Sequence, residues 1–415
     1  MKTITTLFLI MLISVTVVAQ DVYVCGFENN GTKNVAKVWK NGASQPPLTN
    51  GMHHAIAYSV FVENNNVYAG GAQAVSNQIA TVWVNGSPVA LTSGSNSAGV
   101  LSVFVSGGVG YAAGYVWNGP ISTATLWVDG VAQSLTNGSN SSSANSVFVS
   151  DGDVYVVGYE NNGSKDVAKY WKNGNEFVLT DGGQDARANG IFVTGGDVYV
   201  VGYETVSLDS TSWPVAKIWV NGVPSSLSGL ESNAYSVFKK NNQVYVTGYA
   251  MYQGDQRVIY WMNGSGQFIN LPSNNGVGQS IYVSGALPDV YIAGYESNGT
   301  HNVAKLWKNG VQQILSSGGT EAGAFSVFVD DETLSVEAPK TLPDFLTVYP
   351  NPAQSLLHIK ASKPCVLQLY NLQGQLLNTI EVANQHKTID ITNLSSGLYL
   401  LKDIDTGYTQ KIIKE

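Results

Sequence analysis

Short apolar segments recur throughout residues 21–330, and Gly, Asn, Asp or Ser separate one from the next. Some are apolar at successive positions, as in Ser146-Val147-Phe148-Val149, which is typical of strands buried on both faces. Apolar residues at a 3.6-residue period, the mark of an amphipathic helix, are absent. The pattern therefore predicts many short β-strands joined by turns.

These segments form a repeat that occurs seven times, and one residue type marks each of its four segments. The Phe segments contain Phe61, Phe104, Phe148, Phe192, Phe238, Tyr282 and Phe328. The Tyr segments contain Tyr23, Tyr68, Tyr111, Tyr155, Tyr199, Tyr245 and Tyr291. The Trp segments contain Trp39, Trp83, Trp127, Trp171, Trp219, Trp261 and Trp307. The Leu segments contain Leu48, Leu91, Leu135, Leu179, Leu227, Leu271 and Leu315. Seven groups of four strands predict an all-β fold, a seven-bladed β-propeller of four-stranded blades.

Turn residues and prolines predict how each blade is connected. Asn-Gly or Asp-Gly stands two residues after every Trp, which predicts a type I′ hairpin between the Trp and Leu segments. Prolines cluster in or beside Leu segments, so we expect the Leu strand at the outer edge and the Phe strand innermost. The chain opens on a Tyr segment at Asp21 and ends the repeats on a spare Phe segment, Ser326–Val329. One blade would thus combine three N-terminal strands with one C-terminal strand, a 3+1 closure of the ring.

Co-occurring charges suggest a register between the Tyr and Trp strands. Four repeats carry a Glu five residues after the Tyr, and the same four carry a Lys two residues before the Trp, as in Glu28 and Lys37. If the two charges oppose each other directly, a glycine found in all seven repeats faces the Trp, as Gly26 would face Trp39. We therefore expect the indole to lie across the glycine.

The two ends of the chain differ from the repeats. Lys2 and the apolar run Leu7–Val18 predict a cleaved signal peptide over residues 1–19, ahead of a propeller over 20–330. Residues 331–344 read as a linker. From residue 345 a new set of motifs follows: Val348-Tyr349-Pro350-Asn351-Pro352, Leu369-Tyr370-Asn371-Leu372-Gln373-Gly374, Leu394-Ser395-Ser396-Gly397-Leu398-Tyr399 and the terminal Lys411-Ile412-Ile413-Lys414.

Residues 345–415 closely resemble the type A C-terminal sorting domain of the type IX secretion system of Bacteroidetes-type bacteria. The resemblance implies a small C-terminal β-sandwich that the secretion machinery reads. It further implies export through the periplasm to the extracellular space or the outer cell surface, with removal of the domain as the usual outcome. It does not bear on what the propeller does.

Composition narrows the function classes. The net charge of −8 and the pI near 5.1 argue against nucleic-acid binding, because few basic residues are available to neutralise phosphates. Two cysteines in 415 residues exclude a disulfide framework. Beyond the signal peptide, no apolar stretch is long enough to span a membrane. His53 and His54 are neighbours, but no clustered acid or cysteine accompanies them, so we expect no metal and no cofactor.

Candidate binding residues are those aromatic and basic side chains that depart from the repeat. We expect the tight turns of every blade at one rim and the longer, variable connections at the other, where recognition usually occurs. The candidates are Tyr58, Trp117, Arg187, Trp213, Tyr235, Tyr252, Arg257 and Phe325. Exposed aromatic rings stack on sugars or anchor protein partners. Alternatively, these residues cap the blades and bind nothing.

No catalytic motif accompanies these residues. The sequence therefore favours a monomeric, secreted or cell-surface propeller that binds an extracellular glycan or protein and is not an enzyme. Two alternatives stay open: a hydrolase or lyase acting on polysaccharide with catalytic residues in the long loops, and a purely structural or adhesive surface component. Paired carboxylates in the mouth of the ring would favour the enzyme.

Overall fold

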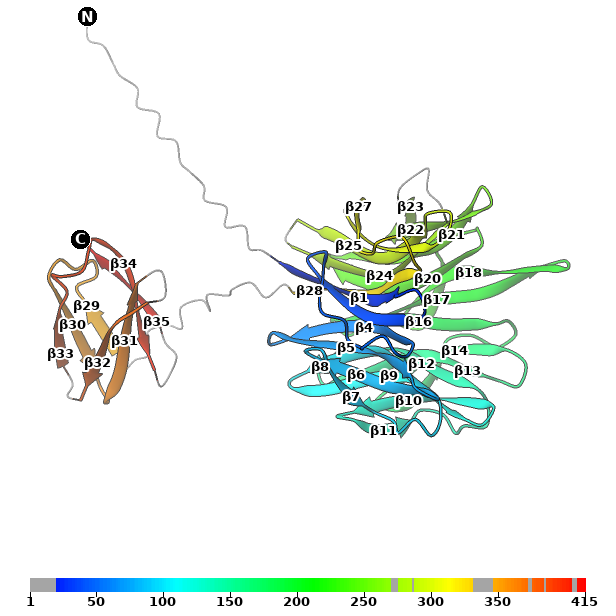
Figure 1. The fold of residues 1–415 in the computed structure, drawn as a ribbon, viewed down its shortest axis with the longest axis horizontal. Coiled ribbons are helices and arrows are strands. Elements are labelled where there is room, and N and C mark those ends of the chain that lie inside the picture. Colours follow the sequence, from blue (N-terminus) through cyan, green and yellow to red (C-terminus); the bar gives the residue numbers. More distant parts are fainter. Residues whose placement is uncertain are drawn as a thin grey trace, which may run out of the picture. The chain divides into compact units, whose positions relative to one another are not determined.

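The computed structural model describes residues 20–269, 275–285, 287–330, 346–371, 375–383, 386–404 and 409–415. They form two compact units, one within residues 20–330 and one within 346–415. Every regular element in these ranges is a β-strand (Figure 1). The expected signal peptide (1–19) and linker (331–344) lie outside the described residues.

A search of the described residues for a helix with the length and hydropathy needed to cross a bilayer finds none.

The first unit consists of seven antiparallel sheets of four strands each, as the repeats predict. The innermost strands of blades 1 to 7 are β28 (Ala322–Asp330), β4 (Ala55–Glu63), β8 (Ala98–Ser106), β12 (Ser142–Ser150), β16 (Ala186–Thr194), β20 (Ser232–Lys240) and β24 (Gly276–Ser284). The second strands are β1 (Asp21–Asn29), β5 (Asn66–Ala74), β9 (Val109–Asn118), β13 (Asp153–Asn161), β17 (Asp197–Leu208), β21 (Gln243–Tyr252) and β25 (Asp289–Ser297).

The third strands carry the Trp residues, and the fourth strands form the outer edge. The third strands are β2 (Asn34–Lys40), β6 (Gln78–Val84), β10 (Ile121–Val128), β14 (Asp166–Lys172), β18 (Thr211–Val220), β22 (Asp255–Met262) and β26 (Asn302–Lys308). The fourth strands are β3 (Ala43–Ser44), β7 (Ser87–Ala90), β11 (Val131–Ser134), β15 (Asn175–Val178), β19 (Val223–Ser226), β23 (Ser265–Phe268) and β27 (Val311–Ile314). The predicted order, Phe strand innermost and Leu segment outermost, is confirmed.

The ring is closed by strands from opposite ends of the repeat region. Strand β28 pairs with β1 over the register Asp21↔Asp330 to Glu28↔Ala322, so the predicted 3+1 blade is confirmed (Figure 1). Each innermost strand contacts the innermost strand of the next blade, and β28 contacts β4, which completes the circle. The first unit is therefore a seven-bladed β-propeller.

The predicted hairpins are present, and their Asn or Asp side chains also hydrogen-bond to the second strand. Asn41 and Gly42 both have positive φ, 52° and 79°, as a type I′ turn requires, and the other six repeats match. In addition, Asn41 Oδ1 accepts a hydrogen bond from the Val22 amide at 2.8 Å. An equivalent bond occurs in every other blade. The turn side chain thus joins the third and second strands at the tight-turn rim.

The repeated Trp side chains form the core between blades. All seven are at most 1% exposed. Trp83 of blade 2 packs with Tyr23, Cys25 and Val38 of blade 1. Trp39 of blade 1 packs in the same way against Tyr291 and other residues of blade 7, so this contact also crosses the closure. Burial of seven large aromatic rings makes the blade interfaces a principal source of hydrophobic stabilisation.

The glycine shared by all repeats does not face the Trp, so the register predicted from the charges is wrong by two residues. Gly26 pairs with Lys37, Trp39 pairs with Val24, and Glu28 pairs with Val35. Glycine is required at this position for a different physical reason. A Cβ on any of the seven would lie 1.8–2.0 Å from a carbonyl oxygen of the innermost strand, which is Gly323 O for Gly26. Backbone, not indole, occupies the space that glycine leaves free.

The Glu–Lys pairs themselves are present, but they are diagonal neighbours. Lys37 Nζ lies 2.6 Å from Glu28 Oε2, and Lys169 Nζ lies 2.6 Å from Glu160 Oε2. Glu204–Lys217 and Glu296–Lys305 make the same pair. Both side chains are long enough to reach two residues along the neighbouring strand, which is why co-occurrence identified the partners but not the register.

Seven aromatic rings surround the propeller axis. The markers of the Phe segments contact one another in a closed circle, with ring centroids 4.5–5.3 Å apart. The circle includes the pair Phe61–Phe328 across the closure. The aromatic circle thus narrows the space along the propeller axis, on the tight-turn side of the innermost strands.

At five of the seven interfaces, a serine two residues before the marker joins the innermost strands of neighbouring blades. The hydroxyls of Ser59, Ser102, Ser236, Ser280 and Ser326 each accept the amide of a residue in the next blade, at 3.0–3.2 Å. At the two remaining interfaces an asparagine side chain makes the connection instead: Asn145 donates to Ala188 O and Asn189 donates to Ala234 O, both at 2.9 Å.

The second unit is a small β-sandwich, as expected. Its strands are β29 (Leu346–Tyr349), β30 (Leu356–Ala361), β31 (Cys365–Asn371), β32 (Leu376–Val382), β33 (His386–Asp390), β34 (Gly397–Asp403) and β35 (Thr409–Lys414). They form the sheets β29-β30-β33 and β32-β31-β34-β35 around one apolar core. Asn351 joins the first motif to the last strand, because its side chain bonds Lys411 O and the Ile413 amide.

Replacing a shared glycine by alanine will destabilise the propeller strongly. In Gly202→Ala the new Cβ would lie 1.9 Å from Arg187 O, so the innermost strand must move. We expect a loss of about 3 kcal/mol in the free energy of unfolding. Denaturant titration followed by Trp fluorescence reports on the propeller alone, because all 9 Trp residues precede residue 331. The control is Gly229→Ala, where no atom lies within 4 Å of the new Cβ. Equal effects of the two substitutions would contradict this explanation of the glycine.

A serine whose hydroxyl accepts a hydrogen bond from an amide of the next blade will contribute more to stability than a serine without that bond. Ser236→Ala leaves the Ile281 amide without its acceptor, and we expect a loss of about 1 kcal/mol. Ser146 occupies the same repeat position, but among the described residues its hydroxyl accepts no such bond, so Ser146→Ala is a matched control with little effect. The same fluorescence titration measures both. A larger loss for Ser146→Ala would show that the serines stabilise the ring by other means.

Candidate functional site

A cavity of about 460 Å³ lies on the propeller axis, and a repeated backbone irregularity forms its lining. Each innermost strand has a β-bulge against the second strand, so one residue per blade is left without a partner. All seven of these bulge residues line the cavity: Phe325, Tyr58, Leu101, Asn145, Asn189, Tyr235 and Gln279 in blades 1 to 7. The bulge is therefore what aims a side chain at the axis.

A second layer of the lining follows directly after the bulge. It consists of Ser326, Ser59, Ser102, Ser146, Gly190, Ser236 and Ser280 in blades 1 to 7. No member of the aromatic circle lines the cavity in the described chain. The cavity thus lies on the long-connection side of that circle.

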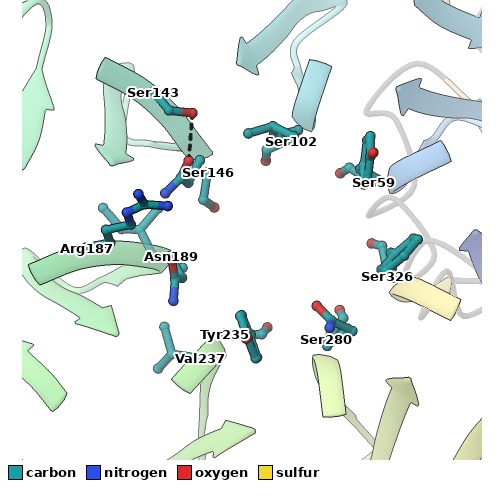
Figure 2. A pocket seen from close by; sticks show the side chains of 18 of the residues that line it. Ser59, Ser102, Ser143, Ser146, Arg187, Asn189, Tyr235, Val237, Ser280 and Ser326 are labelled. Atoms are coloured by element: carbon teal, nitrogen blue, oxygen red, sulfur yellow. Dashed lines mark hydrogen bonds between the residues drawn. The ribbon is translucent and has the colours of Figure 1, made fainter. Parts of the chain in front are cut away.

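The bulge residues of blades 1 to 3 form an aromatic side of the cavity and those of blades 4 and 5 form a polar side, while blades 6 and 7 add Tyr235 and Gln279. Phe325, Tyr58 and Leu101 follow one another in blades 1 to 3, and the ring centroids of Tyr58 and Phe325 are 5.4 Å apart. Asn145 and Asn189 follow in blades 4 and 5. Figure 2 shows Arg187, Ser146 and Asn189 along one side of the cavity and Ser59 and Ser326 along the other. The cavity can therefore contact one apolar face and one polar edge of a ligand.

Arg187 supplies the charge at the polar side. Its Nε and Nη2 both contact Asp166 Oδ2, at 2.7 and 2.6 Å, and its guanidinium carbon lies 4.1 Å from the centroid of the Tyr159 ring. Lys165 and Asp185 form a neighbouring ion pair at 3.0 Å. The carboxylate and the aromatic face hold the guanidinium in a fixed orientation, which reduces the entropy lost when it binds a ligand.

The second strands carry a set of aromatic residues, here called the collar, beside the innermost strands. The residue after the shared glycine is aromatic in six blades, and these six residues form the collar: Phe27, Tyr115, Tyr159, Tyr203, Tyr249 and Tyr295. Two collar rings contact the bulge residue of their own blade, with ring centroids 5.9 Å apart for Phe27–Phe325 and 6.3 Å apart for Tyr235–Tyr249. Of the collar, Tyr159 also lines the cavity in the described chain.

Burial keeps the tyrosines of this region protonated. It raises the pKa of Tyr58 to about 12, and it also raises the pKa values of Tyr159 and Tyr235. Their hydroxyls therefore remain neutral hydrogen-bond donors throughout the neutral and mildly alkaline range. The walls of the cavity accordingly combine aromatic faces with neutral donors.

The structure brings four of the eight sequence candidates together. Tyr58, Arg187, Tyr235 and Phe325 line the axial cavity. Trp117 is 39% exposed and lies on a separate surface hollow of about 370 Å³ with Gln78 and Asn96.

The other three candidates lie on hairpins away from the cavity. Trp213 pairs with Val206 in the extended β17–β18 hairpin. The Tyr252 ring lies 5.1 Å from the Phe268 ring, and Arg257 is 7% exposed with Asp255 at 2.8 Å. These three candidates therefore do not share a site with the other four.

Sequence reasoning missed the three amide side chains that line the cavity. It sought aromatic and basic departures on the long connections, whereas Asn145, Asn189 and Gln279 are amides. Like the four candidates that line the cavity, they lie inside strands and not on the connections. A signal for them was present: this repeat position is Phe, Tyr, Leu, Asn or Gln, while the position after it is serine in six of the seven repeats. The collar was missed for the opposite reason, since its tyrosines recur and were read as part of the frame.

The lining determines which chemistry the cavity can support. No Asp or Glu is among the described residues that line it, so a pair of carboxylates flanking a scissile bond is absent there. A search of the described residues also finds no cluster of three metal-ligating side chains. What the cavity offers is stacking surfaces, amides, hydroxyls and one guanidinium, a set suited to binding.

Comparisons with known proteins bear on the second unit. Residues 347–415 match the family model of the secretion system C-terminal sorting domain. No curated protein matches the chain.

Several solved structures show a distant likeness. One is PorZ, a bacterial surface component of the type IX secretion system of Porphyromonas gingivalis, at 13% identity and a TM-score of 0.32, covering 92% of this chain and 73% of that one. TolB from Acinetobacter baumannii has 14% identity and a TM-score of 0.41, covering 59% of this chain and 61% of that one. A mutant of the Bombyx mori GH32 β-fructofuranosidase BmSUC1, in complex with sucrose, has 10% identity and a TM-score of 0.30, covering 86% of this chain and 85% of that one. These scores carry no argument about activity.

The family match agrees with the motifs of the sandwich. The second unit is a type IX secretion C-terminal sorting domain, and the chain that carries it is exported to the cell surface or the extracellular space.

Proposed function

We propose that the propeller is a non-enzymatic, monomeric module that binds an extracellular glycan in its axial cavity. The observation that carries the proposal is the division of the cavity into an aromatic side, with Phe325 and Tyr58, and a polar side, with Asn145 and Asn189. A pyranose ring has the same division, because its C–H groups form an apolar face and its hydroxyls form a polar edge.

The size and the rigidity of the cavity support this function. A volume of about 460 Å³ falls within the usual range for small-ligand pockets, roughly 300–1,000 Å³. The walls are innermost strands that are paired within each blade and hydrogen-bonded between blades, so a ligand meets a preformed site. Preformed sites lose little entropy on binding.

Glycan binding fits the lining better than the three alternatives do. A glycoside hydrolase needs two carboxyl groups about 5–10 Å apart, and the described lining contains none. A purely structural ring has no requirement for a bulge residue that varies from blade to blade beside a position that is serine in six of the seven blades. The protein-binding alternative predicts a flat exposed patch, whereas four sequence candidates face a cavity.

Removing the aromatic side will weaken glycan binding without unfolding the ring. We choose Tyr58→Asn and Phe325→Asn, because blades 4 and 5 carry asparagine at this repeat position. The full mature chain is screened on a glycan array, and affinities for retained glycans are measured by calorimetry. We expect each substitution to raise Kd at least about 10-fold, the equivalent of roughly 1.4 kcal/mol.

Tyr252→Asn is the control, since this aromatic ring packs on Phe268 outside the cavity. We expect its Kd to match that of the unmodified chain. Retention of no glycan by the unmodified chain would reject the proposed function. Equal losses in all three variants would place binding elsewhere on the propeller.

A further inference from the structure

We propose that the axial cavity recognises a carboxylate group, so that its ligand is an acidic saccharide. The carboxylate would bind the guanidinium of Arg187, and the backbone amides of Ile191 in blade 5 and Val237 in blade 6 would be further donors to the ligand. This inference rests on the proposed glycan-binding function and names the class of glycan.

Two backbone amides in this sector lack the partner that their equivalents have. In five blades the amide two residues after the bulge donates to the serine of the preceding blade, as Val103 does to Ser59 at 3.0 Å. The equivalent amides of Ile191 and Val237 have no such acceptor among the described residues. These are also the two blades in which that residue itself lines the cavity. The same strand position therefore changes from an interblade link to a donor that faces the cavity.

The missing acceptor at Val237 has a steric cause. The serine of the other six blades is replaced by Gly190, and a Cβ there would lie 2.6 Å from Tyr235 O. The backbone of blade 6 thus approaches too closely for a side chain. The interface is instead joined through Asn189, whose Nδ2 reaches Ala234 O at 2.9 Å. This substitution of one link by another keeps the ring closed while the amide stays available to a ligand.

Arg187 adds a charged donor to the same sector. Its two bonds to Asp166 use Nε and Nη2, and no protein partner of Nη1 is found in the described chain. Figure 2 shows Arg187, Asn189 and Val237 on the same side of the cavity. A guanidinium that keeps one edge free and is fixed by a carboxylate and an aromatic face is well suited to a ligand carboxylate.

The charge around this sector favours an anion over a cation. Arg187 is the one ionised side chain in the described lining, and no carboxylate accompanies it there. Asp166 is largely buried beneath the guanidinium, with a side chain 13% exposed against 41% for Arg187. A ligand therefore meets the positive partner of the pair and two N–H dipoles. Charge-assisted bonds of this kind are stronger than neutral ones.

The test uses the mature chain and matched glycans in three forms: the free acid, its methyl ester and the neutral sugar, with oligogalacturonate, its ester and the corresponding neutral galactan as the first set. We expect esterification to raise Kd at least about 10-fold, and we expect binding of the acid to weaken as NaCl rises.

The informative variant is Arg187→Asn/Asp166→Asn. Both replacements occur naturally at the same repeat positions, as Asn233 in blade 6 and Asn34 in blade 1. Changing both members avoids leaving a buried, unpaired carboxylate. We expect a loss of affinity for the acid of at least about 10-fold and no change for neutral forms. The control Lys308→Gln/Asp289→Asn removes an ion pair of 2.8 Å in blade 7 and should leave binding unchanged.

The outcomes separate the two proposals. If neutral and acidic glycans bind equally and the double variant is unaffected, the acidic-ligand inference is overturned and the glycan-binding function survives. If no glycan of any kind is retained, the proposed function fails and the inference with it. Fluorescence of the buried Trp residues verifies that each variant is folded.

Discussion

The close approach of one carbonyl oxygen to one glycine in each blade is the constraint on which the rest of the structure depends. A Cβ at Gly158 would lie 1.9 Å from Ser143 O, and the other six glycines are placed alike. The innermost strand can come this near only because the second strand carries no side chain at that point. The same stretch contains the bulge that turns Asn145 toward the axis. One steric allowance thus fixes the strand pairing and also creates the lining of the cavity.

Symmetry and its local loss have separate roles in this ring. The Trp side chains, the type I′ turns and the serine links repeat from blade to blade, and they make the frame rigid. Blades 4 to 6 depart from the pattern at Gly190 and at the two asparagines that replace serine links. A sevenfold ring with identical blades would present the same surface to a ligand in seven orientations. Because blades 4 to 6 depart from the repeat, one sector of the cavity differs from the rest. The polar side and Arg187 both lie in that sector.

The sorting domain and the axial cavity belong to different units of the chain. The sorting domain has its own core and sheets, and its motif residues hold it together internally, as Asn351 and Tyr399 do through bonds to Lys411 O and Ser395 O. The propeller supplies a repeated frame on which a few variable positions line the axial cavity. The positions that line the cavity can therefore change without disturbing the frame, because the bulge residues have no pairing partner on the second strand.

The sequence by itself determined the seven blades, their strand order, the hairpins, the 3+1 closure and the sorting domain. All of these depend on local patterns, namely period, turn residues and motifs, that recur often enough to be read. Four cavity residues were also identified, because Tyr58, Arg187, Tyr235 and Phe325 depart from the repeat. Only the tertiary structure decided the register, since long Glu and Lys side chains reach a diagonal partner as easily as a direct one. It alone also decided the site. Which strand position faces the axis depends on a bulge, and which amide lacks an acceptor depends on how closely two blades approach.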